Sequence, residues 1–130
     1  MHLSALTLII PDYDEAIAFY CDVMGFDLTE DIDQGHKRWV RVTPPGGGAG
    51  MILAEPANEG QRTAIGNQGA GRVWLFLNTD NFERDYNALR AKAVVFEELP
   101  RHEPYGTVAV FRDIFGNRWD LIGSAAPAAA

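Results

Sequence analysis

Residues 106–122, GTVAVFRDIFGNRWDLI, contain two alternating strand patterns on either side of one turn. In the first pattern Val108 and Val110 occupy alternate positions, and in the second pattern Trp119 and Leu121 do. The letters DIFGN between them supply Asp, Gly and Asn, which favour turns because their side chains or backbones tolerate tight bends. The stretch therefore predicts two strands joined by a short turn.

A fainter copy of this stretch lies 68 residues earlier. The matched positions are Val40 with Val108, Val42 with Val110, the turn 44–50 with 112–118, and 51–53 with 119–121. The front of each half repeats as well, at a spacing of 69 residues. Its matched positions are Tyr13 with Phe82, Ile17 with Tyr86, Tyr20 with Leu89 and Met24 with Ala93. We interpret the chain as one module used twice.

Composition limits the class of protein. The chain has 130 residues, which suits one domain. Its net charge of −7 disfavours nucleic acid, because phosphate binding needs clustered Lys and Arg. The sequence contains no apolar run long enough for a membrane span and no secretory signal pattern. Because Cys21 is alone, no intrachain disulfide can form. We therefore expect a cytoplasmic protein without nucleic-acid or membrane partners.

Each half follows the order strand, helix and three strands, which predicts an α+β fold of two βαβββ modules. The fold class expected is a pair of curved mixed sheets around a cleft, with the helices on the outer faces. The single domain 1–130 divides into module 1 (about 3–55), a linker without periodicity (56–71), module 2 (about 72–123) and a frayed tail (124–130). The predicted strands are 3–10, 26–31, 37–43 and 51–55, then 72–78, 94–99, 107–112 and 118–122; the predicted helices are 13–23 and 81–91.

Strand periodicity assigns side chains to the two faces of each sheet. The aliphatic parity, which includes Val108 and Val110, is expected under the helices. The opposite parity carries aromatic and charged residues, as small-molecule sites do. The predicted ligand-binding residues are Thr7, Trp39, Arg41, Trp74, Phe76, Asn78, Tyr105, Phe111, Arg118 and Asp120. Two alternatives stay open: the aromatic rings pack in a core or dimer interface, and the charged residues form salt bridges within the sheet.

The segments DYDEAIAFYCDVMGFDL (12–28) and EPYGTVAVFRDIFGNRWDLI (103–122) resemble the vicinal oxygen chelate superfamily. This group contains glyoxalase I, extradiol dioxygenases, fosfomycin-resistance enzymes and bleomycin-resistance proteins. The resemblance covers about residues 3–123. The fold is shared by unrelated chemistries, so function must come from the site.

The resemblance implies a metal-ligand position on the first and last strand of each module. Those positions are occupied here by Ala5, Ile52, Trp74 and Asp120. Only Asp120 can donate to a divalent ion, and one carboxylate is too few for a catalytic metal. We therefore expect no cofactor. A divalent metal remains the alternative, on a site assembled from His2, Glu55, His102 and Asp120.

Three functions are compatible with the sequence. The first is a metal-free protein that binds a small aromatic or charged molecule, resembling the bleomycin-resistance branch. The second is a lyase, isomerase or dioxygenase-type enzyme, with Asp120 as general base and Arg41 or Arg118 with Tyr105 polarising a carbonyl. The third is a structural domain. The acidic chain suits a cation, the arginines suit a carboxylate or phosphate, and the ligand's charge is left open. A homodimer is expected in each case.

Overall fold

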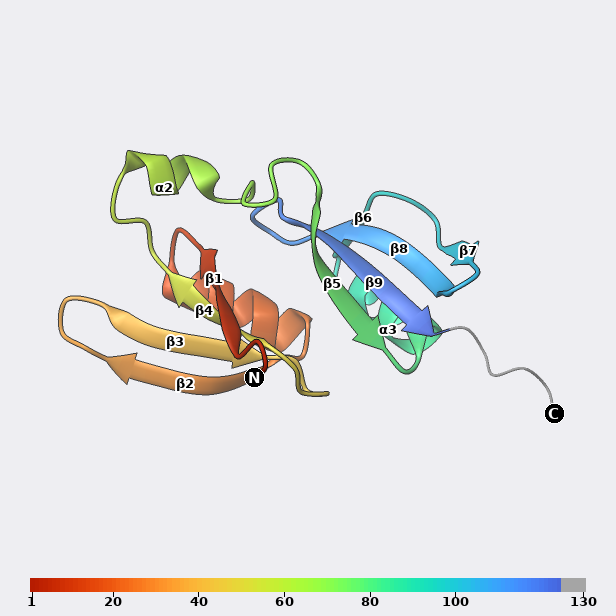
Figure 1. The fold of residues 1–130 in the computed structure, drawn as a ribbon, viewed down its shortest axis with the longest axis horizontal. Helices are drawn as coiled ribbons and strands as arrows, with labels where there is room; N and C mark the ends of the chain where they lie inside the picture. Colours follow the sequence, from red (N-terminus) through yellow and green to blue (C-terminus); the bar gives the residue numbers. More distant parts are fainter. Residues whose placement is uncertain (125–130) are drawn as a thin grey trace. The chain divides into compact units, whose positions relative to one another are not determined.

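The computed structural model describes residues 1–124, which fold into two compact units. The first unit is Met1–Ile65, and the second begins at Gly66. Each unit is a mixed sheet with its longest helical segment against one face (Figure 1). The α+β class and the two-module organisation are thus confirmed. Of the predicted tail, Ser124 ends a strand instead of fraying, and 125–130 lie outside the described residues.

The first unit has four strands in the order β1-β4-β3-β2. Their bounds are β1 Ala5–Ile9, β2 Asp27–Asp33, β3 Arg38–Thr43 and β4 Gly50–Ala54. Strand β1 runs parallel to β4, and the other pairs are antiparallel. This order places the first and last strands of the module side by side.

The helix between β1 and β2 changes its geometry along its length. It is an α-helix in α1 (Tyr13–Ile17) and a π-helix in η1 (Ala18–Val23). The side chain of Asp12 caps its start by accepting a hydrogen bond from the Glu15 amide at 2.9 Å. Gly25 follows its end with φ +77°, a conformation that favours glycine. The predicted helix 13–23 has the right extent, but its π-helical half was not foreseen.

The segment 56–71, interpreted as a linker without periodicity, contains a short helix in its middle. Helix α2 spans Glu59–Ala64. The Asn58 side chain accepts from the Gln61 amide at 2.9 Å, and the Gln61 side chain accepts from the Ala57 amide at 2.7 Å. This reciprocal cap resembles a capping box. The helix is too short for a hydrophobic period to reveal it.

The second unit has strands β5 (Val73–Thr79), β6 (Val95–Phe96), β7 (Arg101–Glu103), β8 (Gly106–Arg112) and β9 (Arg118–Ser124). Their order is β5-β9-β8-β6, with β7 also paired to β8, and β5 is parallel to β9. Helix α3 (Phe82–Ala91) packs against β9. Of the predicted strand 94–99, only β6 is a strand; β7 lies beyond it, after residues 97–100. Pro100 explains part of the break, because proline has no N–H to donate.

The predicted faces hold for five of the six strands to which faces were assigned, but they fail for β8. Ala109 pairs with Leu121, and Phe111 pairs with Trp119, so Ala109 and Phe111 share the helix side. Phe111 is 0% exposed. Its prediction as a ligand contact was therefore wrong, and Val108 and Val110 lie on the opposite face. The turn before β9 is one residue shorter than the turn before β4. Residues of β8 therefore correspond to residues of β3 at a spacing of 69, whereas residues of β9 correspond to residues of β4 at a spacing of 68.

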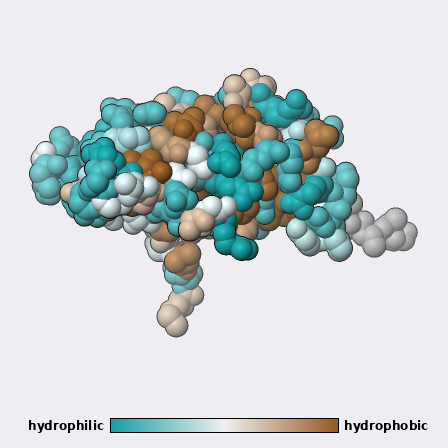
Figure 2. All heavy atoms as spheres, turned by 90° about the horizontal axis from the view of Figure 1, so that it is seen from above, coloured by the Kyte–Doolittle hydropathy of each residue, from teal (hydrophilic) through white to brown (hydrophobic). Residues whose placement is uncertain are grey.

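The core of the second unit is a row of aromatic rings from helix to sheet. Tyr86 contacts Phe96 at a centroid distance of 4.7 Å, Phe96 contacts Phe111 at 5.5 Å, and Phe111 stacks on Trp119 at 5.7 Å. In the first unit, Phe19 and Tyr20 are buried with Leu8, Val40 and Leu53. Apolar residues also reach the surface, as the brown areas of Figure 2 show. The large exposed ones include Leu28, Ile32, Trp39, Phe76, Val95, Leu99, Tyr105 and Ile114.

Candidate functional site

The turn between β8 and β9 is held by one buried carboxylate. Asp113 Oδ1 accepts hydrogen bonds from the amides of Phe115 and Asn117, both at 3.0 Å. Asp113 Oδ2 accepts from Asn117 Nδ2 at 2.9 Å and from Trp119 Nε1 at 3.1 Å. Four donors converge on one side chain, which compensates for its removal from water. The turn is thus rigid, and it fixes the residues that precede and follow it.

A glycine-rich loop, residues 66–71, lies against this turn. A Cβ atom at Gly66 would lie 2.8 Å from the carbonyl carbon of Phe115 and overlap its oxygen. A Cβ atom at Gly69 would lie 2.7 Å from the Cβ atom of Trp74. The loop therefore packs backbone to backbone on the turn, an approach that only glycine allows.

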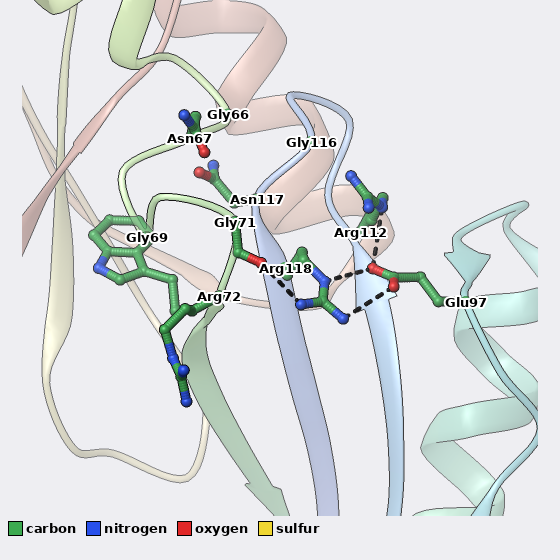
Figure 3. Close-up of a pocket in the computed structure, with 11 residues that line it drawn as sticks. Gly66, Asn67, Gly69, Gly71, Arg72, Glu97, Arg112, Gly116, Asn117 and Arg118 are labelled. Carbon is green, nitrogen blue, oxygen red and sulfur yellow. Dashed lines mark hydrogen bonds and ion pairs between the residues drawn. The ribbon is translucent and has the colours of Figure 1, made fainter.

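Loop, turn and sheet end enclose a cavity of about 330 Å³ within the second unit (Figure 3). This is at the lower end of the volumes of small-molecule pockets. Its lining consists of Gly66, Asn67, Gly69, Gly71, Arg72, Trp74, Glu97, Arg112, Gly116, Asn117 and Arg118. Three arginines and one glutamate give this lining a formal charge of +2, in a chain whose net charge is −7. The cavity is therefore a locally cationic place in an acidic protein.

Two of the arginines share one carboxylate. Arg112 and Arg118 are paired across the hairpin, and the Nε atoms of both bind Glu97 Oε2, at 3.0 and 2.9 Å. Arg118 Nη2 also donates to Glu97 Oε1 at 3.1 Å, and Arg118 Nη1 donates to the Gly71 carbonyl at 3.0 Å. Figure 3 shows these contacts as dashed lines. The hydrogen bond from Arg118, with the charge of both guanidinium groups, lowers the pKa of Glu97 and keeps it ionised.

Asn117 places an unsatisfied acceptor at the wall of this cavity. The residue is 2% exposed, and its Nδ2 donates to Asp113, which fixes the orientation of the amide. Asn117 Oδ1 has no hydrogen-bond partner among the described residues. In Figure 3 the amide points toward the loop that carries Asn67. Buried acceptors are normally paired, so this atom marks a place where a donor would be favourable.

Asp120 lies on the open face of the same sheet, which is the face turned away from α3. It pairs with Phe76 of β5, and Phe76 is 59% exposed. Burial of the carboxyl raises the pKa of Asp120, against the opposing charge of Arg101 and Arg118. Asp120 Oδ1 has no hydrogen-bond partner within residues 1–124. A carboxyl with a raised pKa on an open sheet face is a candidate functional group.

The other predicted ligand residues fall into two groups. In the second unit, Trp74 and Arg118 line the cavity, Asn78 lies on the open face beside Ile122, and Tyr105 is exposed in the turn before β8. In the first unit, Thr7 and Arg41 flank Ile52 on the open face of the sheet, and Trp39 follows on the same parity.

Two of these first-unit side chains donate hydrogen bonds within their own unit. Arg41 Nη2 donates to the Ser4 carbonyl at 2.7 Å, and Trp39 Nε1 donates to Glu30 at 3.0 Å. Neither belongs to the lining of the cavity in the second unit. The structure thus gathers only Trp74 and Arg118, from the predicted set, around that cavity.

The donor set does not fit a divalent metal of the kind that the resemblance implies. Ala5, Ile52 and Trp74 have no metal-binding atoms, which leaves Asp120 alone. Within the described residues 1–124, no group of three or more His, Cys, Asp or Glu side chains could hold a metal ion. The alternative set takes His2 and Glu55 from the first unit and His102 and Asp120 from the second, and it stays a prediction.

Sequence reasoning missed most of the cavity. Glu97, Arg112 and Asn117 were not predicted as site residues, and Gly66, Gly69 and Gly71 were treated as linker. One signal was available: Arg112 and Arg118 flank the turn symmetrically, so a hairpin places them opposite each other. Like charges in that position repel, so a neighbouring negative charge was to be expected there. The contribution of Glu97 and of the loop required the tertiary structure.

Comparisons with known proteins agree with this fold. A model of the Glyoxalase/Bleomycin resistance protein/Dioxygenase superfamily matches residues 2–121. An uncharacterized protein of Shewanella frigidimarina is 50% identical over 120 residues, or 90% of this chain and 89% of the relative. The crystal structure of UcmS2 is similar with a TM-score of 0.80 and 33% identity, covering 94% of this chain and 97% of the other.

A further similar structure is TnmS3, described as an antibiotic binding protein from Streptomyces sp. CB03234. It has a TM-score of 0.77 and 26% identity, and the match covers 96% of this chain and 97% of TnmS3. In the part of the chain that the structure describes, no helix has the length and apolar character needed to cross a membrane.

Proposed function

Because this chain belongs to the Glyoxalase/Bleomycin resistance protein/Dioxygenase superfamily, we propose that it binds a small aromatic molecule without a divalent metal. The observation that carries this proposal is the cavity of the second unit, which combines Trp74 with charged and polar groups. Small-molecule sites use aromatic or apolar surface for contact and placed polar groups for orientation, and this cavity offers one indole and several polar groups. TnmS3, a similar structure, is described as an antibiotic binding protein.

The proposal places the ligand against the indole of Trp74, with Phe76 as a second aromatic surface on the same strand. Aromatic side chains contribute large contact areas and stack on planar molecules. Cytoplasmic location and a homodimer are part of the proposal. Light scattering at micromolar concentration tests the dimer, and a monomer there would contradict it.

The test is binding by the untagged protein, purified without chelator and analysed for bound metal. A panel of aromatic cations, neutral compounds and anions is screened by thermal shift and calorimetry. We expect saturable binding by at least one chemical class, unchanged after treatment with EDTA. Stoichiometric bound metal, or a melting rise of several degrees with Mn, Fe, Ni, Co or Zn ions, would contradict the metal-free proposal.

A second candidate function is an enzyme with Asp120 as general base. The observation that favours it is the desolvated carboxyl of Asp120 beside exposed Phe76. In this role Asp120 would accept a proton from a bound substrate and be protonated in the product complex. Replacing Asp120 by Asn would then abolish turnover, whereas a pure binding protein would keep its affinity within a few-fold. Turnover that survives Asp120→Asn would exclude this mechanism.

A further inference from the structure

We infer that the ligand is an aromatic carboxylate whose acidic group is received by Arg112, beside the ion-paired Arg118, at the cavity of the second unit. This inference rests on the proposed function and names the ligand class that the sequence left open. It follows from the charge balance of the cavity, from the free donors of one arginine and from the position of Trp74.

The charge balance at the hairpin is incomplete. Arg112 and Arg118 are cross-strand neighbours, and like charges in that position destabilise a sheet. Glu97 lies between them and contacts both, yet it supplies one negative charge for two positive ones. Arg72 adds another positive charge to the lining. Asp120 and Glu98 act on Arg118 from a greater distance, so a second carboxylate in contact with Arg112 would complete the direct pairing of the two guanidinium groups.

The two arginines differ in the donors that remain for a ligand. Arg118 is anchored on Glu97 and on the Gly71 carbonyl, and its side chain is 28% exposed. Arg112 uses its Nε for Glu97 and is 49% exposed. Among the described residues, Glu97 is the ion-pair partner of Arg112, and the contact leaves its terminal nitrogens available. Arg112 therefore presents the free edge of a planar guanidinium, the geometry that suits a carboxylate.

The same cavity provides a surface for the rest of the ligand. Trp74 lines it at the start of β5, where the pairing with β9 is irregular between Val73 and Leu75. Gly69 packs on the Cβ of Trp74 and so limits the indole from one side. A volume of about 330 Å³ suits one or two fused rings, not a large drug. The ring of an aromatic acid would contact the indole, and its carboxylate would bind the guanidinium group.

The experiment uses four probes of one shape: 2-naphthoate, 2-naphthamide, 2-naphthylmethylammonium and 2-naphthyl phosphate. Calorimetry with the full-length protein at low salt gives each affinity. We expect naphthoate to bind at least about 10-fold more tightly than the amide, and the ammonium compound to bind most weakly. Raising the salt concentration should weaken naphthoate binding and leave amide binding unchanged.

Two variants locate the acidic group. Arg112→Gln should lower naphthoate affinity about 10-fold and leave amide affinity within about two-fold. Arg62→Gln removes the same charge from the exposed helix α2 and should change neither. Amide NMR spectra confirm that both variants are folded, and naphthoate should shift the signals of Gly69, Gly71 and Asn117.

Several outcomes overturn the inference. They are equal or tighter binding of the amide or ammonium probe, no effect of Arg112→Gln, naphthoate shifts confined to other residues, and no binding by any of the four probes. Phosphate binding about ten-fold tighter than naphthoate binding overturns the assignment to a carboxylate. If neutral or cationic aromatics bind instead, the proposed function stands and the ligand class alone is wrong. If no compound of the wider panel binds, both fail.

Discussion

Gly66 lies so close to Phe115 that a Cβ at Gly66 would overlap the carbonyl oxygen of Phe115. This contact joins the glycine-rich loop to the β8–β9 turn, and it brings the two walls of the cavity together. The backbone of Gly66 also has φ +74°, in the left-handed region. Both features require glycine, and they can be separated experimentally.

Gly66→Ala should destabilise the protein by about 2–5 kcal/mol, because it adds steric overlap to the cost of positive φ. Gly71→Ala is the matched control: its φ is +87°, but nothing lies within 4 Å of a Cβ there. It should cost about 1–2 kcal/mol. Urea denaturation measures both. Equal losses would show that the contact with Phe115 is not tight.

Asp113→Asn should destabilise the protein by about 2–4 kcal/mol, because an amide nitrogen would face donors that now bind the carboxylate. The four hydrogen bonds to Asp113 all lie in the β8–β9 turn. Asp12→Asn is the control, since Asn caps a helix as well as Asp does. Its effect should stay within about 0.5 kcal/mol in the same denaturation experiment. A mild effect of Asp113→Asn would contradict the role of the carboxylate.

Phe111→Ala should destabilise the protein much more than Phe76→Ala does. Phe111 is fully buried between Phe96 and Trp119, so its loss should cost about 3–5 kcal/mol. Phe76 is exposed on the open face, and its loss should cost less than about 1 kcal/mol. Thermal unfolding distinguishes the two. A large loss of stability in the Phe76 variant would indicate that this ring is packed rather than available to a ligand.

Asp120→Asn should raise the melting temperature at pH 7 by about 1–3 °C. Burial raises the pKa of Asp120 above its ordinary value of 3.8, so the ionised carboxylate opposes folding as pH rises from that value through the folded-state pKa. Asn cannot ionise. The advantage of the variant should therefore decline as pH falls toward 3.8.

Asp27→Asn, at an exposed position of β2, removes the same charge without relieving burial. It should change stability by less than about 0.5 kcal/mol. Melting curves of both variants from about pH 4 to neutral pH test the difference. A gain for Asp120→Asn that does not depend on pH would show that ionisation is not its cause.

The local elements could be predicted because each depends on neighbouring residues. Asp12 caps the first helix and Gly25 ends it, and both residue types favour these positions. The DIFGN turn is likewise set within its own segment, by the hydrogen bonds of Asp113. Helix α2 was missed although its cap is also local, because Asn58 and Gln61 lie in a segment without a hydrophobic period.

The amino-acid pattern was thus sufficient to predict the two modules, the main helix of each, and the unsuitability of Ala5, Ile52 and Trp74 as metal ligands. The face of Phe111 became known only from the strand pairing, because one residue fewer in a turn moves every side chain of a strand to the other side. The cavity likewise depends on tertiary packing. Glu97, the glycine loop and the two hairpin arginines are far apart in the chain, and no local pattern specifies that packing brings them together.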